Sequence, residues 1–367
     1  MTITKTQSNI IDILKGLLPI LVVMLHTSFD ASLSYQDGVE PFLRILITKF
    51  GGIAVPCFFF ISGMLFFTRL NEWDWEIWKD KLRKRVKSLF VPFVLWIAIA
   101  FVLKFAWGVL KHELPGFSIS AIKDYFISSG GLKIFYDKPI TEFSNSFLGF
   151  SVDESKPLDG PLWYVRDLIV LVLLSPVIWT ILKKSRYYAV AILGLIYLLF
   201  IGFPFVLVSP TGLFFFSAGA AFSMSGKDFL ETFKKFKQPS IILSLIFLVL
   251  AFAITNPIWN DLVYRLFVIS TVVTIFNLTA GLYDAGRIKP IKLLTDSSFF
   301  IYASHAVLIT EISNFLLWRA LPITAEWMLV LKVFLRPAIA VGICLLIFVV
   351  MRKICPKILG LLTGGRF

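Results

Sequence analysis

The amino-acid sequence predicts an all-α, polytopic integral membrane protein: a helical bundle of about ten transmembrane helices, with the N- and C-termini both cytoplasmic. Three observations support this fold class. First, 57% of the 367 residues are hydrophobic, only 16% are charged, and the mean hydropathy is +0.83, whereas a soluble domain carries roughly a quarter charged residues. Second, apolar runs long enough to cross the hydrocarbon core follow one another with short polar breaks. Third, Lys and Arg are concentrated in alternate breaks, as the positive-inside rule requires.

The apolar runs define the expected spans. We place them near residues 8–29, 48–68, 89–109, 162–182, 189–207, 210–224, 240–256, 262–283, 297–318 and 330–351. The sixth run is short, and Pro204 and Pro210 are expected to break or tilt the helices that contain them. We expect residues 1–367 to form a single membrane-embedded domain with no appended soluble domain.

Two of the breaks are distinctive. Residues 69–88 form a basic segment that we expect to be a cytoplasmic loop, and residues 110–161 form a long extracytoplasmic loop, either a cap over an outward cavity or a passive surface loop. The net charge of +13 follows from the positive-inside rule. No basic soluble module is evident, so nucleic-acid binding is not expected. The three cysteines are scattered without the spacing of a metal site, and no metal is expected.

The first span carries ionisable residues on a helix that should lie in lipid. Lys15 and His26 are 11 residues apart, so their side chains share one stripe and lie about 16 Å apart along the axis. Asp12 precedes Lys15 by one turn and can pair with it, while Asp30 follows His26 by one turn and can orient its imidazole. Pro19 deprives the Lys15 carbonyl of its helical N–H partner, and such an acceptor needs water or a side chain at membrane depth. We therefore expect this helix to line a polar conduit.

Each of these residues also has a structural interpretation. The Lys15 stem can extend so that its ammonium reaches the cytoplasmic surface, and His26 can be an interfacial histidine near a helix end. An ionisable residue inside a span is nevertheless a functional candidate, because placing it there is costly. Periodicity alone leaves both interpretations open.

A second polar stripe lies in the ninth span. Ser298, Tyr302 and His305 recur at i, i+4 and i+7, so they lie on one face of a helix. This pattern is typical of a substrate-binding surface or of hydrogen bonds that hold membrane helices together.

Charged residues also occur next to the third and fourth spans. Arg83, Arg85 and Lys87 form a dense cationic run that can hold phosphates, although topological anchoring is the commoner role of such a run. Arg166 and Asp167 follow Trp163 at the start of the fourth span, and we expect them to partner polar groups on other helices.

Taken together, these segments resemble the acyltransferase 3 family of membrane O-acyltransferases. The resemblance rests on five segments in family order: Asp12-x-x-Lys15-Gly16 with Val22-Val23-x-x-His26, Phe59-Phe60-Ile61-Ser62-Gly63, the basic run ending Phe90-Val91-Pro92, Pro161-Leu162-Trp163-Tyr164, and Ser298-Phe299-Phe300-Ile301-Tyr302-x-x-His305. There are two departures. Lys15 stands where the family usually has arginine, which keeps the charge but loses the planar fork, and the Arg-x-x-Arg pattern of the inner loop is blurred.

The resemblance implies transfer of an acyl group, most often acetyl, from cytoplasmic acyl-CoA to a hydroxyl of a cell-surface or lipid-linked polysaccharide. His26 would then be the catalytic base, and Lys15, Asp12 and Asp30 would be the other catalytic residues, either in direct transfer or through an acyl-histidine. The CoA phosphates would lie against Arg83, Arg85 and Lys87, next to Lys15. The residues expected to bind substrate or line the pore are Ser62, Trp163, Arg166, Asp167, Ser298, Tyr302 and His305.

The expected partners follow from this activity. They are membrane lipid, acyl-CoA as co-substrate, a glycan acceptor and the polysaccharide-export machinery, in the bacterial inner or cytoplasmic membrane. A different interpretation is a transporter or flippase of lipid-linked sugars, since intramembrane charges and proline-broken helices also suit alternating access. A third is a structural partner in an envelope assembly. The acceptor glycan, and the choice between an acetyl and a succinyl donor, stay open.

Overall fold

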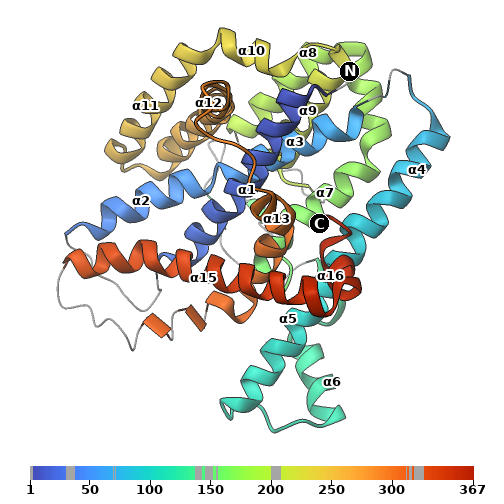
Figure 1. Cartoon of the computed structure of the whole chain (residues 1–367), viewed down its shortest axis with the longest axis vertical. Helices are drawn as coiled ribbons and strands as arrows, with labels where there is room; N and C mark the ends of the chain where they lie inside the picture. The colour runs from blue at the N-terminus through green and yellow to red at the C-terminus, as the bar shows by residue number, and fades with distance from the viewer. Residues whose placement is uncertain are drawn as a thin grey trace.

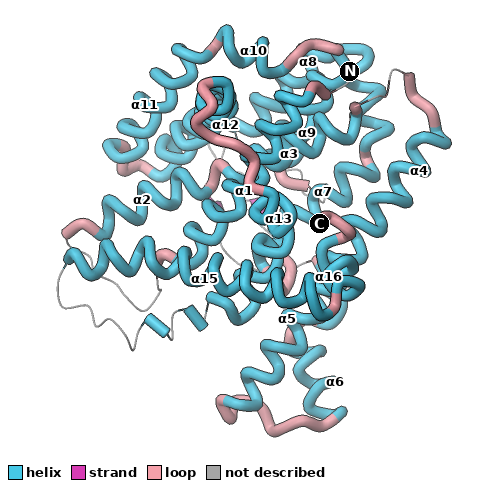
Figure 2. The backbone as a smooth tube through the Cα atoms, in the orientation of Figure 1, coloured by secondary structure: helices cyan, strands magenta, loops and turns pink. Residues whose placement is uncertain are grey.

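Helices make up almost all of the computed structural model (Figures 1 and 2). The structure describes residues 3–29, 38–68, 70, 72–136, 143–144, 152–153, 156–199, 208–310, 312–313, 316–317 and 326–367.

The main helices are α1 (Lys5–Thr27), α2 (Glu40–Gly51), α3 (Ala54–Phe67), α4 (Trp75–Arg85), α5 (Val91–Leu110), α6 (Ile119–Ser128), α7 (Trp163–Leu173), α8 (Ser175–Leu199), α9 (Pro210–Ser225), α10 (Phe229–Lys235), α11 (Lys237–Ala253), α12 (Pro257–Asp284), α13 (Lys292–Ser304), α15 (Glu326–Ile354) and α16 (Pro356–Thr363). The described residues also include two π-helical turns, η1 (Val86–Phe90) and η4 (His305–Ile309), and two 3₁₀ turns, η2 (Gly131–Phe135) and η3 (Gly160–Leu162). The two-residue strands β1 (Phe143–Ser144) and β2 (Val152–Asp153) pair antiparallel.

The helices confirm an all-helical, multi-pass membrane protein, but they do not confirm about ten spans. Within the described residues, five helical segments are long and apolar enough to cross a membrane: Lys5–Thr27, Glu40–Phe67, Trp75–Leu110, Pro257–Asp284 and Glu326–Ile354. Two further pairs of helices pass the same test only if each bent pair counts as one span, which gives up to seven. Most of the other runs that were expected to span form shorter helices such as α9 and α13.

One expected span is broken by an identifiable feature. The run over 162–182 divides into α7 and α8, with a bend of 66° between Gly160–Leu173 and Ser175–Ser185. Pro176 has no N–H to offer the carbonyl of Val172, and the hydroxyl of Ser175 donates to that carbonyl instead, at 2.6 Å. Pro176 therefore explains why the helix breaks at this point.

The basic segment expected as a loop over 69–88 is largely helical. Asp74 caps α4 by accepting hydrogen bonds from the backbone N–H groups of Glu76 and Ile77, which is the usual role of an aspartate at this position. The helix then continues through η1 into α5. The basic side chains thus project from a rigid element in different directions.

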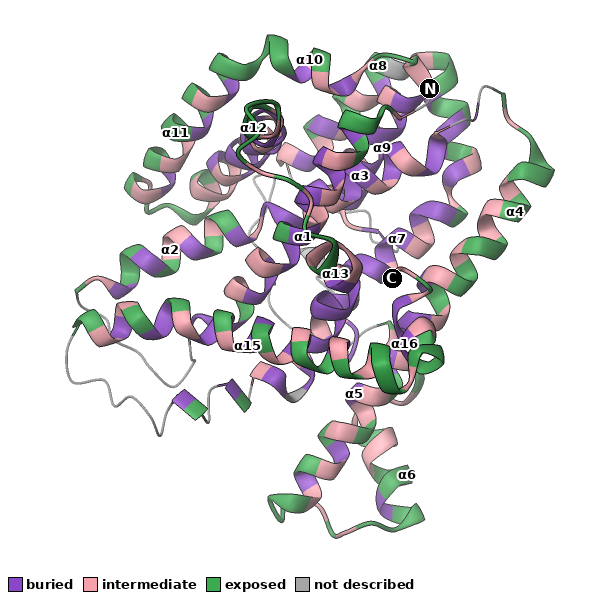
Figure 3. Ribbon diagram, viewed as in Figure 1, coloured by how far each residue is buried: buried purple, intermediate pink, exposed green. Residues whose placement is uncertain are grey.

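The core lies where α3 crosses α9. A Cβ atom added at Gly63 would collide with the backbone of Phe216, and one added at Gly219 would collide with the backbone of Phe60. Small residues let two membrane helices approach this closely. Figure 3 shows buried residues gathered along α3 and α9, and along α1 and α13 beside them. Helix α1 packs against α3, α13 and α15, so its polar stripe lies among the central helices.

Candidate active site

Two histidines from opposite ends of the chain meet in the bundle. His26 lies near the C-terminal end of α1, and His305 is the first residue of η4. Their ring centroids are 5.4 Å apart and the ring planes are inclined by 31°. His305 is fully buried, whereas His26 is exposed. The pair thus joins an accessible imidazole to a buried one.

The backbone fixes the orientation of the buried imidazole. The Nδ1 atom of His305 lies 2.8 Å from the carbonyl oxygen of Tyr302 and 3.2 Å from that of Ile301. A carbonyl oxygen only accepts, so Nδ1 carries the proton and donates. The neutral ring then has its lone pair on Nε2, which is buried and has no hydrogen-bond partner among the described residues. This nitrogen can accept a proton from a substrate or from His26. π-Helical turns such as the one that begins at His305 often occur at functional sites.

A row of aromatic residues extends from this pair. The hydroxyl of Tyr302 donates to the carbonyl of Pro161, and the Tyr302 ring lies 5.8 Å, edge to face, from that of Tyr164. The Tyr164 hydroxyl is 3.0 Å from the hydroxyl of Ser62 on α3. Three of the segments on which the family resemblance rests are therefore in direct contact, although they are far apart in the sequence.

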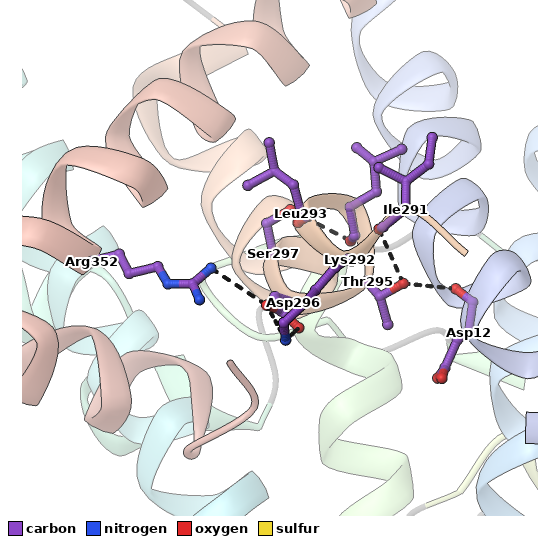
Figure 4. Close-up of polar contacts among 9 residues, drawn as sticks. Asp12, Ile291, Lys292, Leu293, Thr295, Asp296, Ser297 and Arg352 are labelled. Atoms are coloured by element: carbon purple, nitrogen blue, oxygen red, sulfur yellow. Dashed lines mark hydrogen bonds and ion pairs between the residues drawn. The ribbon is translucent and has the colours of Figure 1, made fainter. Parts of the chain in front are cut away.

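The opposite end of the stripe on α1 carries the predicted ion pair. The Nζ atom of Lys15 is 3.5 Å from Oδ1 of Asp12, and each side chain is 35% exposed. The hydroxyl of Thr295 on α13 donates to the backbone carbonyl of Asp12. Figure 4 shows that the next residue, Asp296, reaches the other way to Arg352 on α15. This network fixes α1 against α13 beside Lys15.

Only one of the three expected phosphate-binding residues turns inward. Arg83 and Lys87 are exposed, whereas Arg85 is half-buried and interacts electrostatically with both Lys15 and Tyr164. Arg83 and Lys87 are four residues apart and lie on one face of the helix, whereas Arg85, two residues from each of them, points to the other side. The structure adds Arg366, which also interacts electrostatically with Lys15 and which the sequence analysis did not select.

The end of the long segment 110–161 lies beside the histidines. Lys156 interacts electrostatically with His26, and the Lys104 ammonium donates to the carbonyl of Leu158 at 2.8 Å. Asp159 is 2% exposed, and neither carboxyl oxygen has a hydrogen-bond partner among the described residues. Burial raises the pKa of Asp159 to about 8, against the opposing effect of Lys104. Sequence reasoning did not select Asp159, because a lone aspartate in a mixed-charge loop carries no distinguishing pattern.

The charged pair at the start of α7 connects this helix to two other segments. Arg166 donates to Oδ1 of Asp167 from Nε and Nη2, at 3.1 and 2.8 Å, and to the carbonyl of Tyr136. The other carboxylate oxygen of Asp167 accepts from the backbone N–H of Ser209 at 2.8 Å. Arg166 and Asp167 thus bind each other, and they also connect α7 to the backbone at Tyr136 and Ser209. Trp163 packs its ring against that of Phe59, with centroids 6.1 Å apart.

The remaining predicted residues contribute less to this arrangement. Ser298 is half-buried and makes no hydrogen bond within the described part of the chain. Asp30 lies outside the described residues. In the described ranges, no group of three or more His, Cys, Asp or Glu side chains is placed to hold a metal ion.

Similarity to known proteins covers nearly the whole chain. A profile of the acyltransferase 3 family, described as an acyltransferase domain, matches residues 8–351. The chain is 26% identical over 373 residues to the succinoglycan biosynthesis protein ExoH of Rhizobium meliloti, covering 97% of this chain and 92% of that protein. No solved structure matches the chain. Since the family profile spans nearly the whole sequence, the chain is an acyltransferase and belongs to the acyltransferase 3 family.

Proposed function

We propose that this protein transfers an acyl group from acyl-CoA to a hydroxyl of a cell-surface or lipid-linked polysaccharide, with acetyl-CoA as the first donor to test. The observation that carries the proposal is the contact between His26 and His305, with ring centroids 5.4 Å apart. It places an accessible imidazole next to a buried one whose Nε2 atom has no hydrogen-bond partner among the described residues.

The proposed chemistry uses His26 as a general base. The acceptor oxygen attacks the thioester carbonyl carbon while His26 takes the hydroxyl proton. The carbon–sulfur bond breaks, and CoA leaves as a thiolate that takes a proton from the imidazolium. His305 is held in one tautomer by the carbonyl of Tyr302, 2.8 Å away, and serves as a positioning residue for His26.

The donor would extend along the stripe of α1. Lys15 lies about 16 Å from His26 along the helix axis, so the phosphates would lie near Lys15 and Arg85 while the thioester reaches His26. The Lys15 end and both termini would face the cytoplasm, where Lys and Arg concentrate under the positive-inside rule. His26 would then face the opposite side.

The proposed acceptor is supported by the relative from Rhizobium meliloti, whose name assigns it to succinoglycan biosynthesis. A polysaccharide hydroxyl is a weak nucleophile, so a base beside it is the group that the reaction needs. The arrangement of His26 and His305 supplies such a base.

The test is acyl transfer by purified protein in lipid nanodiscs, followed as CoA release in the presence of a polysaccharide acceptor. We expect His26→Ala to lower kcat by about 10²-fold or more. His112 is the matched control, because it is the remaining histidine of the chain and is exposed at a positive φ of 58°. Asparagine tolerates that backbone conformation, so His112→Asn should leave kcat unchanged.

Full activity of His26→Ala would refute the role of His26. Labelled acyl groups that stay on the wild-type protein after denaturation, in the absence of acceptor, would assign the acyl-histidine route.

A further inference from the structure

The C-terminal segment turns back against the candidate site. After α16 ends at Thr363, Gly364 and Gly365 adopt φ angles of 65° and 73°, which favour glycine. A Cβ atom at Gly364 would collide with the backbone of Ser88 in η1. The indole N–H of Trp96 also donates to the carbonyl of Leu362 at 3.0 Å. The last residues are therefore fixed against η1 and α5.

This turn places Arg366 between two elements of the site. Its Nη2 atom donates to the carbonyl of Ser88 at 2.6 Å, and its Cζ atom lies 4.4 Å from the centroid of the Phe299 ring on α13. Phe299 is one helical turn beyond Thr295, whose hydroxyl binds the Asp12 carbonyl. The guanidinium thus lies close to the polar network around Lys15. Burial, together with repulsion from Arg85, lowers the pKa of Arg366 to about 10, so the group stays charged at neutral pH.

Three cations from distant parts of the sequence converge at this point. Lys15 interacts electrostatically with Arg85 and Arg366, and both arginines interact with Tyr164. Among the described residues, the carboxylate that pairs with any of the three is Asp12, at 3.5 Å from Lys15. Like charges held together raise the free energy of an empty site. A bound anion of more than one charge would relieve this repulsion, and paired guanidinium groups suit phosphate.

We propose that Arg366 binds the diphosphate of the acyl donor together with Arg85 and Lys15, and so makes the C-terminal segment part of the donor site. This inference rests on the proposed function, because it takes acyl-CoA as the donor. The Tyr164 hydroxyl is hydrogen-bonded to Ser62. In this proposal it lies between the phosphate end of the site and Tyr302, which is next to the histidines.

The experiment compares two donors that differ in their phosphates. Acyl-CoA carries the diphosphate, whereas the corresponding S-acyl pantetheine carries the same thioester arm without it. We expect Arg366→Gln to raise the KM for acyl-CoA about tenfold or more, because a charge-assisted contact is lost, and to leave the KM and kcat for S-acyl pantetheine at wild-type values. The KM of Arg366→Lys for acyl-CoA should lie between those of the wild type and Arg366→Gln, since lysine keeps the charge without the planar fork.

The matched control is Lys357→Gln, which removes one cation from the exposed surface of α16 and should change neither donor's parameters. A wild-type KM for acyl-CoA in Arg366→Gln would overturn the inference. An equal loss with both donors would also overturn it, because Arg366 would then only hold the C-terminal segment in place. If the wild-type protein transfers from neither donor, the proposed function itself fails and the inference falls with it.

Discussion

The Nδ1 atom of His305 lies 2.8 Å from the carbonyl oxygen of Tyr302, one turn back on the same helical segment. This contact fixes the tautomer of a buried imidazole whose ring lies against His26. Under the proposed function, the two nitrogens of His305 therefore have separate roles, Nδ1 in orientation and Nε2 towards the site.

The separation of these functions predicts different effects for two substitutions. Asparagine at position 305 can keep a donor near the place of Nδ1 but has no equivalent of Nε2, whereas alanine has neither. We expect His305→Asn to retain thermal stability and to lower kcat by about 10²-fold, and His305→Ala to lower both. Thermal unfolding and CoA release, measured on the same preparations, test this. Wild-type kcat in His305→Asn would show that Nε2 has no role.

The ion pair between Lys15 and Asp12 predicts dependence on charge at position 15. Lys15→Arg should be tolerated, because arginine keeps the positive charge and can still reach Asp12. Lys15→Ala should raise the KM for acyl-CoA about tenfold or more, because the donor loses a cationic contact. Steady-state kinetics at varied acyl-CoA concentrations distinguish the two variants. Equal KM values in all three proteins would show that Lys15 serves only as an anchor.

The crossing of α3 and α9 predicts a position-specific effect on stability. Gly219→Ala places a Cβ atom on the backbone of Phe60, so the helices must separate, and we expect a loss of about 1–3 kcal/mol in the free energy of unfolding. Gly342 on α15 is the control, because an added Cβ there meets no atom within 4 Å. Gly342→Ala should be neutral or stabilising. Similar unfolding temperatures for both variants would contradict the close packing of the backbones.

The buried carboxyl of Asp159 predicts a pH-dependent stability. Its pKa is raised to about 8 in the folded protein, against about 3.9 in an unfolded chain. Between these values the folded state keeps a proton that the unfolded state releases. The contribution to stability is therefore full below about pH 4 and is lost as the pH rises through about 8. Asp159→Asn should flatten the decline in unfolding temperature over this range.

Asp80 provides the control for this experiment, since its side chain is 62% exposed in a surface pair with Lys84. Asp80→Asn should leave the pH dependence unchanged. If the unfolding temperature of Asp159→Asn declines with pH as steeply as that of the wild type, the carboxyl of Asp159 titrates at its ordinary pKa.

Several features of the site could be predicted from local sequence. Helical geometry placed Lys15 and His26 on one stripe and Asp12 beside Lys15, because these relations depend only on the rise and rotation of α1. The contact between His26 and His305 could not be predicted in this way, since it depends on how α1 packs against α13 and η4. Periodicity describes the face of one helix and gives no information about its neighbour.

Two other differences between the predicted and the observed structure had signals in the sequence. The break between α7 and α8 follows from Pro176, and the helix within the expected basic loop begins at the capping residue Asp74. Arg366 had no comparable signal, because its position depends on the two left-handed glycines before it and on the approach of the backbone to Ser88. The described residues do not confirm about ten spans, because apolar composition alone does not distinguish a short buried helix from one that crosses the bilayer.

The π-turn η4 has a consequence for insertions and deletions. It holds one residue more per turn than an α-helix, so removing a single residue between His305 and Ile309 would let the segment relax to α-helical geometry. The residues after the turn would keep their orientation about the axis, because a π-turn takes up one extra residue without changing the register of the helix that follows, and only the residues of the turn, His305 among them, would shift. We therefore expect homologous chains that lack the extra residue to keep the packing of the later segment but to place the side chain at position 305 differently.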